Sequence, residues 1–476
     1  MSDAARTQDP ALLSATELLT HYAAGTLSPV EATEAAFKAI ERHDGTLNAF
    51  CLVDREGALA AARESEARWQ AGSPQGRLDG VPTTVKDLLV AKGWPTRRGS
   101  RTTDDTPSQE DAPSVGNLRR HGAVLIGKTT TPEFGWKGVT DNPLTGITRN
   151  PWNPAMTPGG SSGGAGAAAA MGMGALHIGT DGGGSIRMPC GFCGIPGIKQ
   201  SFGRVSAHPL SPFASVSHVG PMTRTVADSA LMLSVMAGPD PRDPYSLPAS
   251  DEDFTQGLEG GVKGLRIAYS PDLGMNTKVK VDPEIAALVA AAVQRFSDLG
   301  AQVEEVDLAS LPDPTWAFRV IWYSGAGRLL SKIPAEKQEL MDPGLREIAA
   351  EGDSYSLREF QESVSQREAY SIAMARFHQD YDLLLTPGLP IPAFEAGREW
   401  PEGADIERWC DWSPFTWPFN LTGQPAASVP CGLTAAGLPA ALQIVGPRHA
   451  DALVLGAAHA FEQAAPFALP PGAGSL

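Results

Sequence analysis

The stretch from Thr157 to Pro196 constrains this chain more than any other. It reads TPGGSSGG, then an alanine-rich run over 164–174, then GTDGGGSIRMP, so that Ser161 and Ser185 each lie beside a run of glycines. Glycines permit positive φ and bring backbone N–H groups close to a ligand, where consecutive N–H groups favour negative charge. Such a serine combines a nucleophile with donors for an oxyanion, as acyl transfer requires. The alanine-rich run predicts a tightly packed helix.

A serine nucleophile needs a base, and the residues alone leave two kinds open. Lysine is the usual substitute for histidine, provided that burial or cationic neighbours lower its pKa. The candidate is Lys86, at the end of the apolar strand expected over 81–85 in GVPTTVKD. Histidine is the other option, although no histidine lies in a motif typical of a base. These histidines are His208, His218, His378, His449 and His459.

Two short patterns suggest rival functions. Residues 122–129 read GAVLIGKT and match the P-loop expression of nucleotide-binding proteins. A P-loop has its strand before the first glycine, whereas here AVLI between the glycines is itself the expected strand. GGSSG over 159–163 matches the nucleophile elbow of α/β-hydrolases, which follows an apolar strand. The preceding NPWNPAMTP has too many prolines for a central strand.

Composition and charge narrow the function further. The net charge of −16 argues against nucleic acid or an anionic membrane as a partner. No segment approaches the ~20 apolar residues of a membrane span, and the first ten residues contain no secretion signal. Five sparse cysteines are typical of a reducing compartment, so we expect a cytoplasmic protein. Cys190 and Cys193 have no second pair to complete a zinc site, His177 reads as a core histidine, and we expect neither metal nor cofactor.

Several motifs together resemble the amidase signature family of serine hydrolases. They are GGSSGG over 159–164, GTDGGGSIR over 179–187 with the family's spacing between the serines, Lys86-Asp87, and FNLTG over 419–423. The resemblance covers about residues 10–465 and is strongest over 76–230. It implies an α/β protein with the amidase signature fold, a large mixed central β-sheet covered by helices on both faces. It also implies one amidase domain over 1–476, with a signature core at about 76–230 and a variable helical and substrate-pocket region at about 310–420.

The resemblance also implies a role for each residue of the site. By it, Ser185 is the nucleophile, Ser161 is a bridging serine after a cis Gly160–Ser161 peptide, and Lys86 is the final base. The oxyanion hole is expected from the N–H groups of Gly182, Gly183, Gly184 and Ser185, with Asp181 and Arg187 bracing their loop. Gly182 departs from the family, where a larger residue is common, and could loosen that loop.

The implied function is hydrolysis of carbon–nitrogen amide bonds in a small molecule. Gly135, Trp136 and Phe213, with the tryptophans after residue 310, are expected to line an apolar pocket. They favour apolar or aryl amides, with esters and carbamates as further substrates. The alternative within the family is the glutamine-hydrolysing A subunit of a tRNA-dependent amidotransferase. The resemblance leaves room for a homodimer.

The pattern along the chain is that of alternating strands and helices. Strands are expected at 81–85, 123–126, 265–269, 301–306, 382–385, 426–430 and 440–445. Helices are expected at 14–24, 28–43, 54–72, 112–121, 226–236, 283–299, 452–464 and over much of 313–380. The polar segment 131–158 is too long for an idle connection and is expected to line the site.

Overall fold

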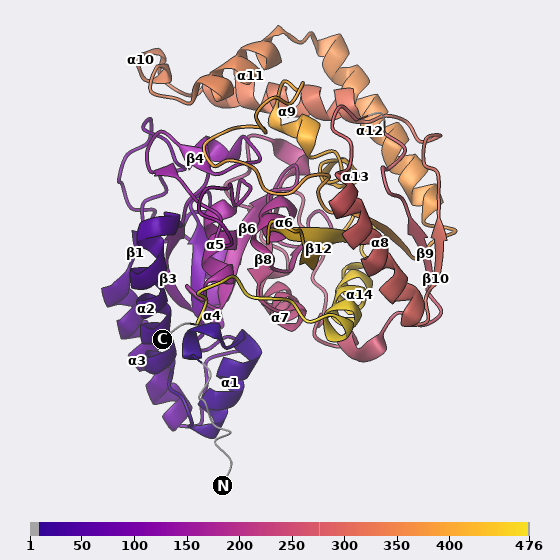
Figure 1. Cartoon of the computed structure of the whole chain (residues 1–476). Helices are drawn as coiled ribbons and strands as arrows, with labels where there is room; N and C mark the ends of the chain where they lie inside the picture. The colour runs from indigo at the N-terminus through magenta and orange to yellow at the C-terminus, as the bar shows by residue number, and fades with distance from the viewer. Residues whose placement is uncertain (1–8, 276, 475–476) are drawn as a thin grey trace.

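Eleven strands form one mixed sheet in the computed structural model, which describes residues 9–275 and 277–474 (Figure 1). Their order across the sheet is β1-β3-β2-β6-β8-β7-β12-β13-β11-β9-β10. The strands are β1 Phe50–Val53, β2 Pro82–Lys86, β3 Val124–Thr129, β6 Leu176–Asp181, β7 Gly197–Lys199, β8 His218–Thr223, β9 Arg266–Tyr269, β10 Gln302–Glu305, β11 Leu383–Pro387, β12 Ala426–Leu433 and β13 Pro439–Val445. A separate hairpin joins β4 Asp141–Asn142 and β5 Gly146–Ile147.

The pairing of β2 with β6 decides where the site lies. The two strands are parallel neighbours, with Val85 opposite Ile178, and β3 lies parallel on the other side of β2. Parallel neighbours end at the same edge of a sheet. Lys86 at the end of β2 and Asp181 at the end of β6 therefore come to one edge, although they are far apart in sequence.

Helices cover both faces of this sheet, as expected (Figure 1). They are α1 Ala15–Ala24, α2 Pro29–Leu47, α3 Arg55–Gln70, α4 Pro113–Arg120, α5 Gly163–Ala170, α6 Arg187–Cys193, α7 Val226–Met236, α8 Pro283–Asp298, α9 Thr315–Leu330, α10 Ala335–Gln338, α11 Pro343–Ser354, α12 Leu357–Phe377, α13 Pro418–Thr422 and α14 Asp451–Ala464. Short 3₁₀ turns include η3 Ala214–Val216 and η5 Trp409–Trp412. Ser14 and Ser28 form capping boxes at the starts of α1 and α2, and α2 continues four residues beyond the expected end.

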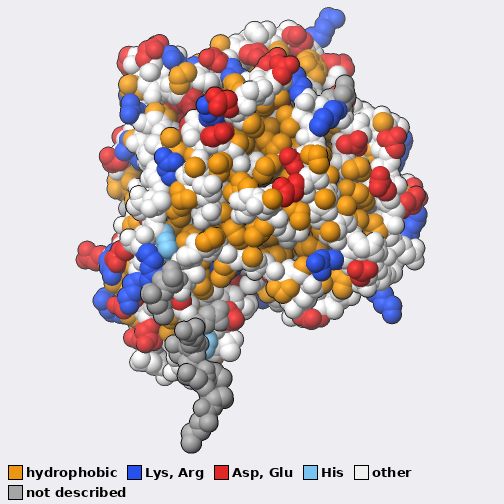
Figure 2. All heavy atoms as spheres, in the orientation of Figure 1, with side chains coloured by type: hydrophobic (Ala, Val, Ile, Leu, Met, Phe, Trp, Pro, Cys, Tyr) orange, Lys and Arg blue, Asp and Glu red, His pale blue; other side chains and the backbone are white. Residues whose placement is uncertain are grey.

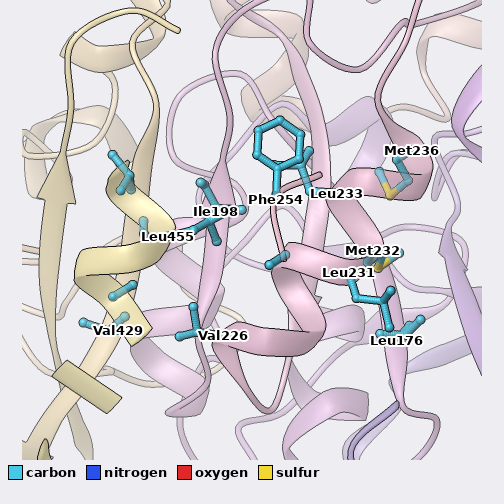
Figure 3. Packing of buried hydrophobic residues seen from close by; sticks show 14 of the residues in the cluster. Leu176, Ile198, Val226, Leu231, Met232, Leu233, Met236, Phe254, Val429 and Leu455 are labelled. Atoms are coloured by element: carbon cyan, nitrogen blue, oxygen red, sulfur yellow. The ribbon is translucent and has the colours of Figure 1, made fainter. Parts of the chain in front are cut away.

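The main core lies between the sheet and helices α7, α8 and α14. Figure 3 shows Leu176 and Ile198 of the strands beside Val226 and Met232 of α7. On the opposite face, the alanines of α5 pack against α6. Val85 belongs to the main core, and successive side chains of a strand alternate between faces. Lys86 therefore points to the other face, where α5 begins just after Ser161 and Ser162.

Three central strands and one helix were not expected from the sequence. They are β6, β7, β8 and α6. Strand β8 reads HVGPMT, and Pro221 pairs opposite Ile178 in the middle of the sheet. Glycine and proline normally weaken a strand pattern, and burial of both faces removes the polar alternation by which strands are recognised. Local pattern therefore reveals β2, which carries Lys86, but hides its neighbour β6 and the next strand, β8.

The surface of the described chain carries a broad apolar area. Figure 2 shows hydrophobic side chains gathered over the middle of one face, with charged groups around them. Among the described helices, none combines the length and apolarity needed to cross a bilayer. The first eight residues, part of the segment in which no secretion signal was expected, lie outside the described residues.

Candidate active site

Lys86 lies in a fully buried cage of three hydroxyl groups. Its Nζ is 2.7 Å from Ser161 Oγ, 2.8 Å from Ser162 Oγ and 2.9 Å from Thr180 Oγ1. The side chain has no exposed surface because α5 and the preceding serine loop cover the face of the sheet to which it points. Burial lowers the pKa of the Lys86 ammonium well below its ordinary 10.5, and the nearby Asp181 carboxylate opposes this only in part. A lysine at a strand end would usually be solvated, and only this covering makes Lys86 a potential base.

The two serine loops meet beside that lysine. The Gly160–Ser161 peptide is cis, as the resemblance implied. A Cβ at Gly160 would lie 2.4 Å from the carbonyl oxygen of Val139, so only glycine fits there. The N–H of Ser162 donates to the backbone oxygen of Ser185 at 3.2 Å and holds the loops together. Ser161 and Ser185 are 2% and 3% exposed, so water has little access to either.

Asp181 and Arg187 brace the loop between them, as expected. The Asp181 carboxylate accepts from the backbone N–H groups of Gly184 (2.7 Å) and Ile186 (3.1 Å) and from two nitrogens of Arg187. Arg187 in turn donates to the backbone oxygen of Thr416 and to the side chains of Gln443 and Asn420. Burial alone would raise the pKa of Asp181, but the Arg187 guanidinium outweighs it and holds that pKa below its usual value.

One of the four expected oxyanion donors has another partner. The N–H of Gly184 points to the Asp181 carboxylate at 2.7 Å. A single N–H engaged at this distance is not free for a substrate oxygen. This part of the sequence interpretation is corrected: Gly184 shapes the loop, with φ +125°, and Gly182, Gly183 and Ser185 remain as candidate donors.

Aromatic side chains lie directly against the first two glycines of this loop, Gly182 and Gly183. A Cβ added to Gly182 would lie 2.9 Å from the Trp322 ring, and one added to Gly183 would lie 2.8 Å from Trp409 and 2.9 Å from Phe318. Such distances are shorter than van der Waals contact. The Trp322 ring thus occupies the space that a larger residue at position 182 would need, and the loop is packed rather than loosened.

Of the three expected pocket residues, Phe213 and Trp136 contact Trp322, and Gly135 lies beside Ser161. Phe213 stacks on Trp322 with ring centroids 3.8 Å apart. The backbone oxygen of Trp136 accepts from Trp322 Nε1 at 3.1 Å, and a Cβ at Gly135 would lie 3.3 Å from Ser161 Oγ. Phe318 was not expected from the sequence, because α9 carries apolar residues on every side and no periodic pattern singles it out.

Thr416 and Gln443 were missed as well. Thr416 Oγ1 donates to the backbone oxygen of Gly183 at 2.7 Å, and Gln443 accepts from Arg187. Both lie more than 200 residues after the loop that they support, and neither belongs to a recognisable motif. Only the sheet order, which brings β13 and the segment before α13 next to α6, makes them neighbours.

The rival motifs have structural roles. Strand β3 runs through GAVLIGKT, so this segment does not form a P-loop, and irregular chain precedes Gly159 where an elbow would need a strand. Cys190 and Cys193 are buried free thiols in α6. His177 is fully buried, with Nδ1 2.8 Å from Thr84 Oγ1 and Nε2 3.3 Å from the oxygen of Gly174. It is a core histidine, as expected.

Comparison with known proteins agrees with this geometry. A family model described as Amidase matches residues 31–455. An acylamidase of Rhodococcus erythropolis is 39% identical over 98% of both chains. The A subunit of the glutamyl-tRNA(Gln) amidotransferase of Myxococcus xanthus is 35% identical over 95% of this chain and 97% of its own. A crystal structure of a bacterial aryl acylamidase of the amidase signature enzymes superimposes with a TM-score of 0.88 and 33% identity over 96% of both chains.

The likeness extends over nearly the full length of each relative, and the range matched by the family model spans the sheet and both glycine-rich loops. A match of this extent exceeds what a shared sheet architecture alone would produce. This chain is therefore a member of the amidase signature family, an enzyme that hydrolyses carbon–nitrogen amide bonds.

Proposed function

We propose that Ser185 is the nucleophile, Ser161 the proton bridge and Lys86 the base of this amidase. The observation that carries the proposal is the buried cage in which Lys86 Nζ meets the hydroxyls of Ser161, Ser162 and Thr180. Burial keeps this lysine neutral at a pH where an exposed lysine is charged. A neutral amine has a lone pair and acts as a base.

Counting hydrogens in the cage distinguishes the two serines. Ser162 Oγ donates to the backbone oxygen of Thr180 at 3.1 Å and accepts from the N–H of Thr180 at 3.2 Å, so toward Lys86 it can only accept. A neutral lysine has two hydrogens and one lone pair. If the hydrogens point to Ser162 and Thr180, the lone pair is directed at Ser161. The hydroxyl hydrogen of Ser161 is then the one that Lys86 can remove.

The reaction follows from this order of groups. Ser161 gives its proton to Lys86 and takes the proton of Ser185, whose Oγ attacks the substrate carbonyl carbon. The carbonyl electrons move to oxygen, and we place the resulting anion at the N–H groups of Gly182, Gly183 and Ser185. The relay then runs backward and protonates the amine as the C–N bond breaks. Water attacks the acyl-enzyme by the same relay, which releases the acid and restores Ser185.

The proposed substrates are apolar or aryl amides, with aryl esters and carbamates as further substrates. Their support is the wall of Trp322, Phe318 and Trp409 against the oxyanion loop, since aromatic walls favour apolar groups. The similar acylamidase and aryl acylamidase point the same way.

A substrate panel tests this choice. Purified enzyme is assayed with matched anilides, aryl carbamates, aryl esters and glutamine. We expect kcat/KM to be highest for the aryl compounds and glutamine to be hydrolysed at background rate. Preference for glutamine would instead support the second candidate, the glutamine-hydrolysing component of a tRNA-dependent amidotransferase. The 35% identity to the Myxococcus xanthus protein over nearly the full chain favours that candidate.

The remaining parts of the proposal concern the domain organisation, the cellular location and the oligomeric state. We propose one catalytic domain over 1–476, acting in the cytoplasm as a homodimer. Strands from both halves of the chain in one sheet support a single domain, and the apolar area in Figure 2 supports self-association. Light scattering should give twice the mass of one chain, and denaturant unfolding should be a single cooperative transition. A monomer, or two separate transitions, would contradict these points.

A further inference from the structure

His218 lies beside the start of the loop over residues 182–185. It is the first residue of β8 and pairs with Asp181 at the end of β6. The ring is 3% exposed. Its Nδ1 is 3.2 Å from the backbone oxygen of Asp181 and 2.9 Å from that of Val216. Both are carbonyl oxygens, which only accept, so Nδ1 carries the ring proton.

Lys199 lies next to the other ring nitrogen of His218, Nε2. Its Nζ is 3.5 Å from His218 Nε2 and also contacts the backbone oxygens of Gln200 and Gln424. Burial and the nearby Arg187 lower the pKa of Lys199, but its Nζ has N–H donors whether it is charged or neutral, and Nε2, which lacks the ring proton, can accept one of them. His218 is therefore held as the Nδ1–H tautomer, with Nε2 as acceptor. In this state Nδ1 already carries a hydrogen and cannot act as a base, and Nε2 faces Lys199.

The side-chain donors and the acceptors behind the loop match in number. The Nδ2 of Asn420 lies 2.8 Å from Asp181 Oδ1, 3.0 Å from the backbone oxygen of Asp181 and 3.0 Å from that of Val216. Two amide hydrogens thus face three acceptors. The single Nδ1–H of His218 supplies the third hydrogen, to one of the two backbone oxygens. Without it, Asn420 can serve both carbonyls only by releasing Asp181 Oδ1, which would keep the N–H of Gly184 and Nη2 of Arg187 as donors.

The Asp181 carbonyl belongs to the same peptide as the Gly182 N–H. This peptide group is planar, and in the trans form its C=O and N–H point in opposite directions. Fixing the carbonyl toward His218 and Asn420 therefore fixes the N–H of Gly182 toward the opposite side. Gly182 has no side chain of its own to hold that orientation.

We propose that His218 is a positioning residue of the hydrolysis: its Nδ1–H holds the Asp181–Gly182 peptide so that the Gly182 N–H points at the oxyanion. The two carbonyl oxygens at Nδ1, of Asp181 and Val216, set the tautomer that this requires. The inference rests on the proposed function, since it assigns the Gly182 N–H to the oxyanion hole. It predicts that losing the Nδ1–H weakens binding of the transition state but not of the ground state.

The test compares His218→Leu, His218→Asn and His177→Leu in the full-length enzyme on one anilide. The Asn side chain can present an N–H close to the position of Nδ1, whereas Leu cannot. His177 is the matched control, a buried histidine on β6 that contacts Thr84 and Gly174 and lies away from the oxyanion loop. We expect His218→Leu to lower kcat about 10- to 100-fold with KM within about twofold, a smaller loss than removal of a direct oxyanion donor.

A tetrahedral analogue separates positioning from a general loss of structure. A trifluoromethyl ketone bonds to Ser185 Oγ and carries an oxyanion on its former carbonyl oxygen. Its affinity should fall by the same factor as kcat in His218→Leu, recover in His218→Asn, and stay unchanged in His177→Leu. Equal losses in both Leu variants, or a loss in KM alone, would overturn the proposal.

Two further measurements distinguish failure of this inference from misfolding of a variant and from failure of the proposed function. Nitrogen-15 NMR of the wild-type enzyme should show His218 protonated at Nδ1 and not at Nε2, and the opposite tautomer would overturn the proposal even if no variant folds. Ser185→Ala is measured alongside. If it is inactive while His218→Leu is normal, only this inference fails. If Ser185→Ala stays active, the proposed function fails.

Discussion

The two halves of the active site are built in different ways. In the half contributed by β2, β6 and the glycine-rich loops, the backbone itself is closely packed. Gly160, Gly182 and Gly183 have no room there for a Cβ. The half contributed by α9 and η5 is made of large side chains, chiefly Phe318, Trp322 and Trp409. The first half carries the residues that we propose to react, and the second packs against Gly182 and Gly183. Chemistry is thus carried by short contiguous motifs, and the shape of the pocket by residues brought together from distant segments.

In the half that carries the glycine-rich loops, replacing the proposed nucleophile should have the largest effect on kcat. Ser185→Ala should lower kcat by about 10⁵-fold or more, as for other serine triads. The fold should survive, because the contact from Ser162 uses the backbone oxygen of residue 185. Burst kinetics and a thermal melt check both points. Activity within tenfold of wild type would exclude Ser185.

Loss of the base should be the next largest effect. Lys86→Ala should slow amide hydrolysis by about 10³- to 10⁵-fold. In the wild type, kcat/KM should rise with pH and then level off, since the free enzyme needs Lys86 neutral and its lowered pKa is crossed from the acid side. A pH profile over 5–10 measures this. An optimum on the acid side would contradict a lysine base.

The bridging serine should matter more for amides than for esters. An amine leaving group must be protonated as it departs, whereas a phenolate needs little help. Ser161→Ala should therefore lower anilide hydrolysis by about 10²- to 10⁴-fold and a matched aryl ester much less. Ser162→Ala is the control, since Ser162 also contacts Lys86 but has its hydrogen engaged by Thr180. Equal losses on both substrates in Ser161→Ala would mean that this serine is not a proton bridge.

The boundary between the two halves can be tested with a pair of substitutions. Gly182→Ala should push the loop against Trp322 and lower kcat about tenfold or more, since overpacking of this kind typically costs 1–3 kcal/mol. Trp322→Ala should remove the obstruction and widen the range of accepted acyl groups. A double-mutant cycle on kcat/KM should show that Trp322→Ala rescues Gly182→Ala in part. Strict additivity would show that the two residues do not interact.

The smallest effect concerns stability of the aromatic half. Burial raises the pKa of Glu399 to about 7, although the N–H of Trp409 and the charge of Arg408 lower it in part. Its ordinary value is 4.5, so the folded protein favours the protonated form and loses stability as pH rises from about 4.5 to 7. Glu399→Gln should thus raise the melting temperature by about 1–3 °C at pH 8 and leave it unchanged at pH 4. An equal shift at both pH values would contradict the raised pKa.

The sequence by itself indicated serine-based hydrolysis of amides. Glycine runs around Ser161 and Ser185 meet a local requirement for close backbone approach, so they can be recognised without a structure. The same holds for the capping boxes of α1 and α2. The alternation of strands and helices also gave the α/β class and most elements outside the centre of the sheet.

Only the tertiary structure decided which groups become reactive and which support them. Burial of Lys86 depends on α5 and the serine loop covering one face of the sheet. The hydrogen bond of the Gly184 N–H depends on the position of the Asp181 carboxylate. Strands β6 and β8 carry glycine, proline and histidine, so their pattern could not reveal them. His218 and Trp322 reach the loop at Gly182 from two different elements. Such contacts are set by sheet order and by packing between segments distant in sequence, which no local pattern encodes.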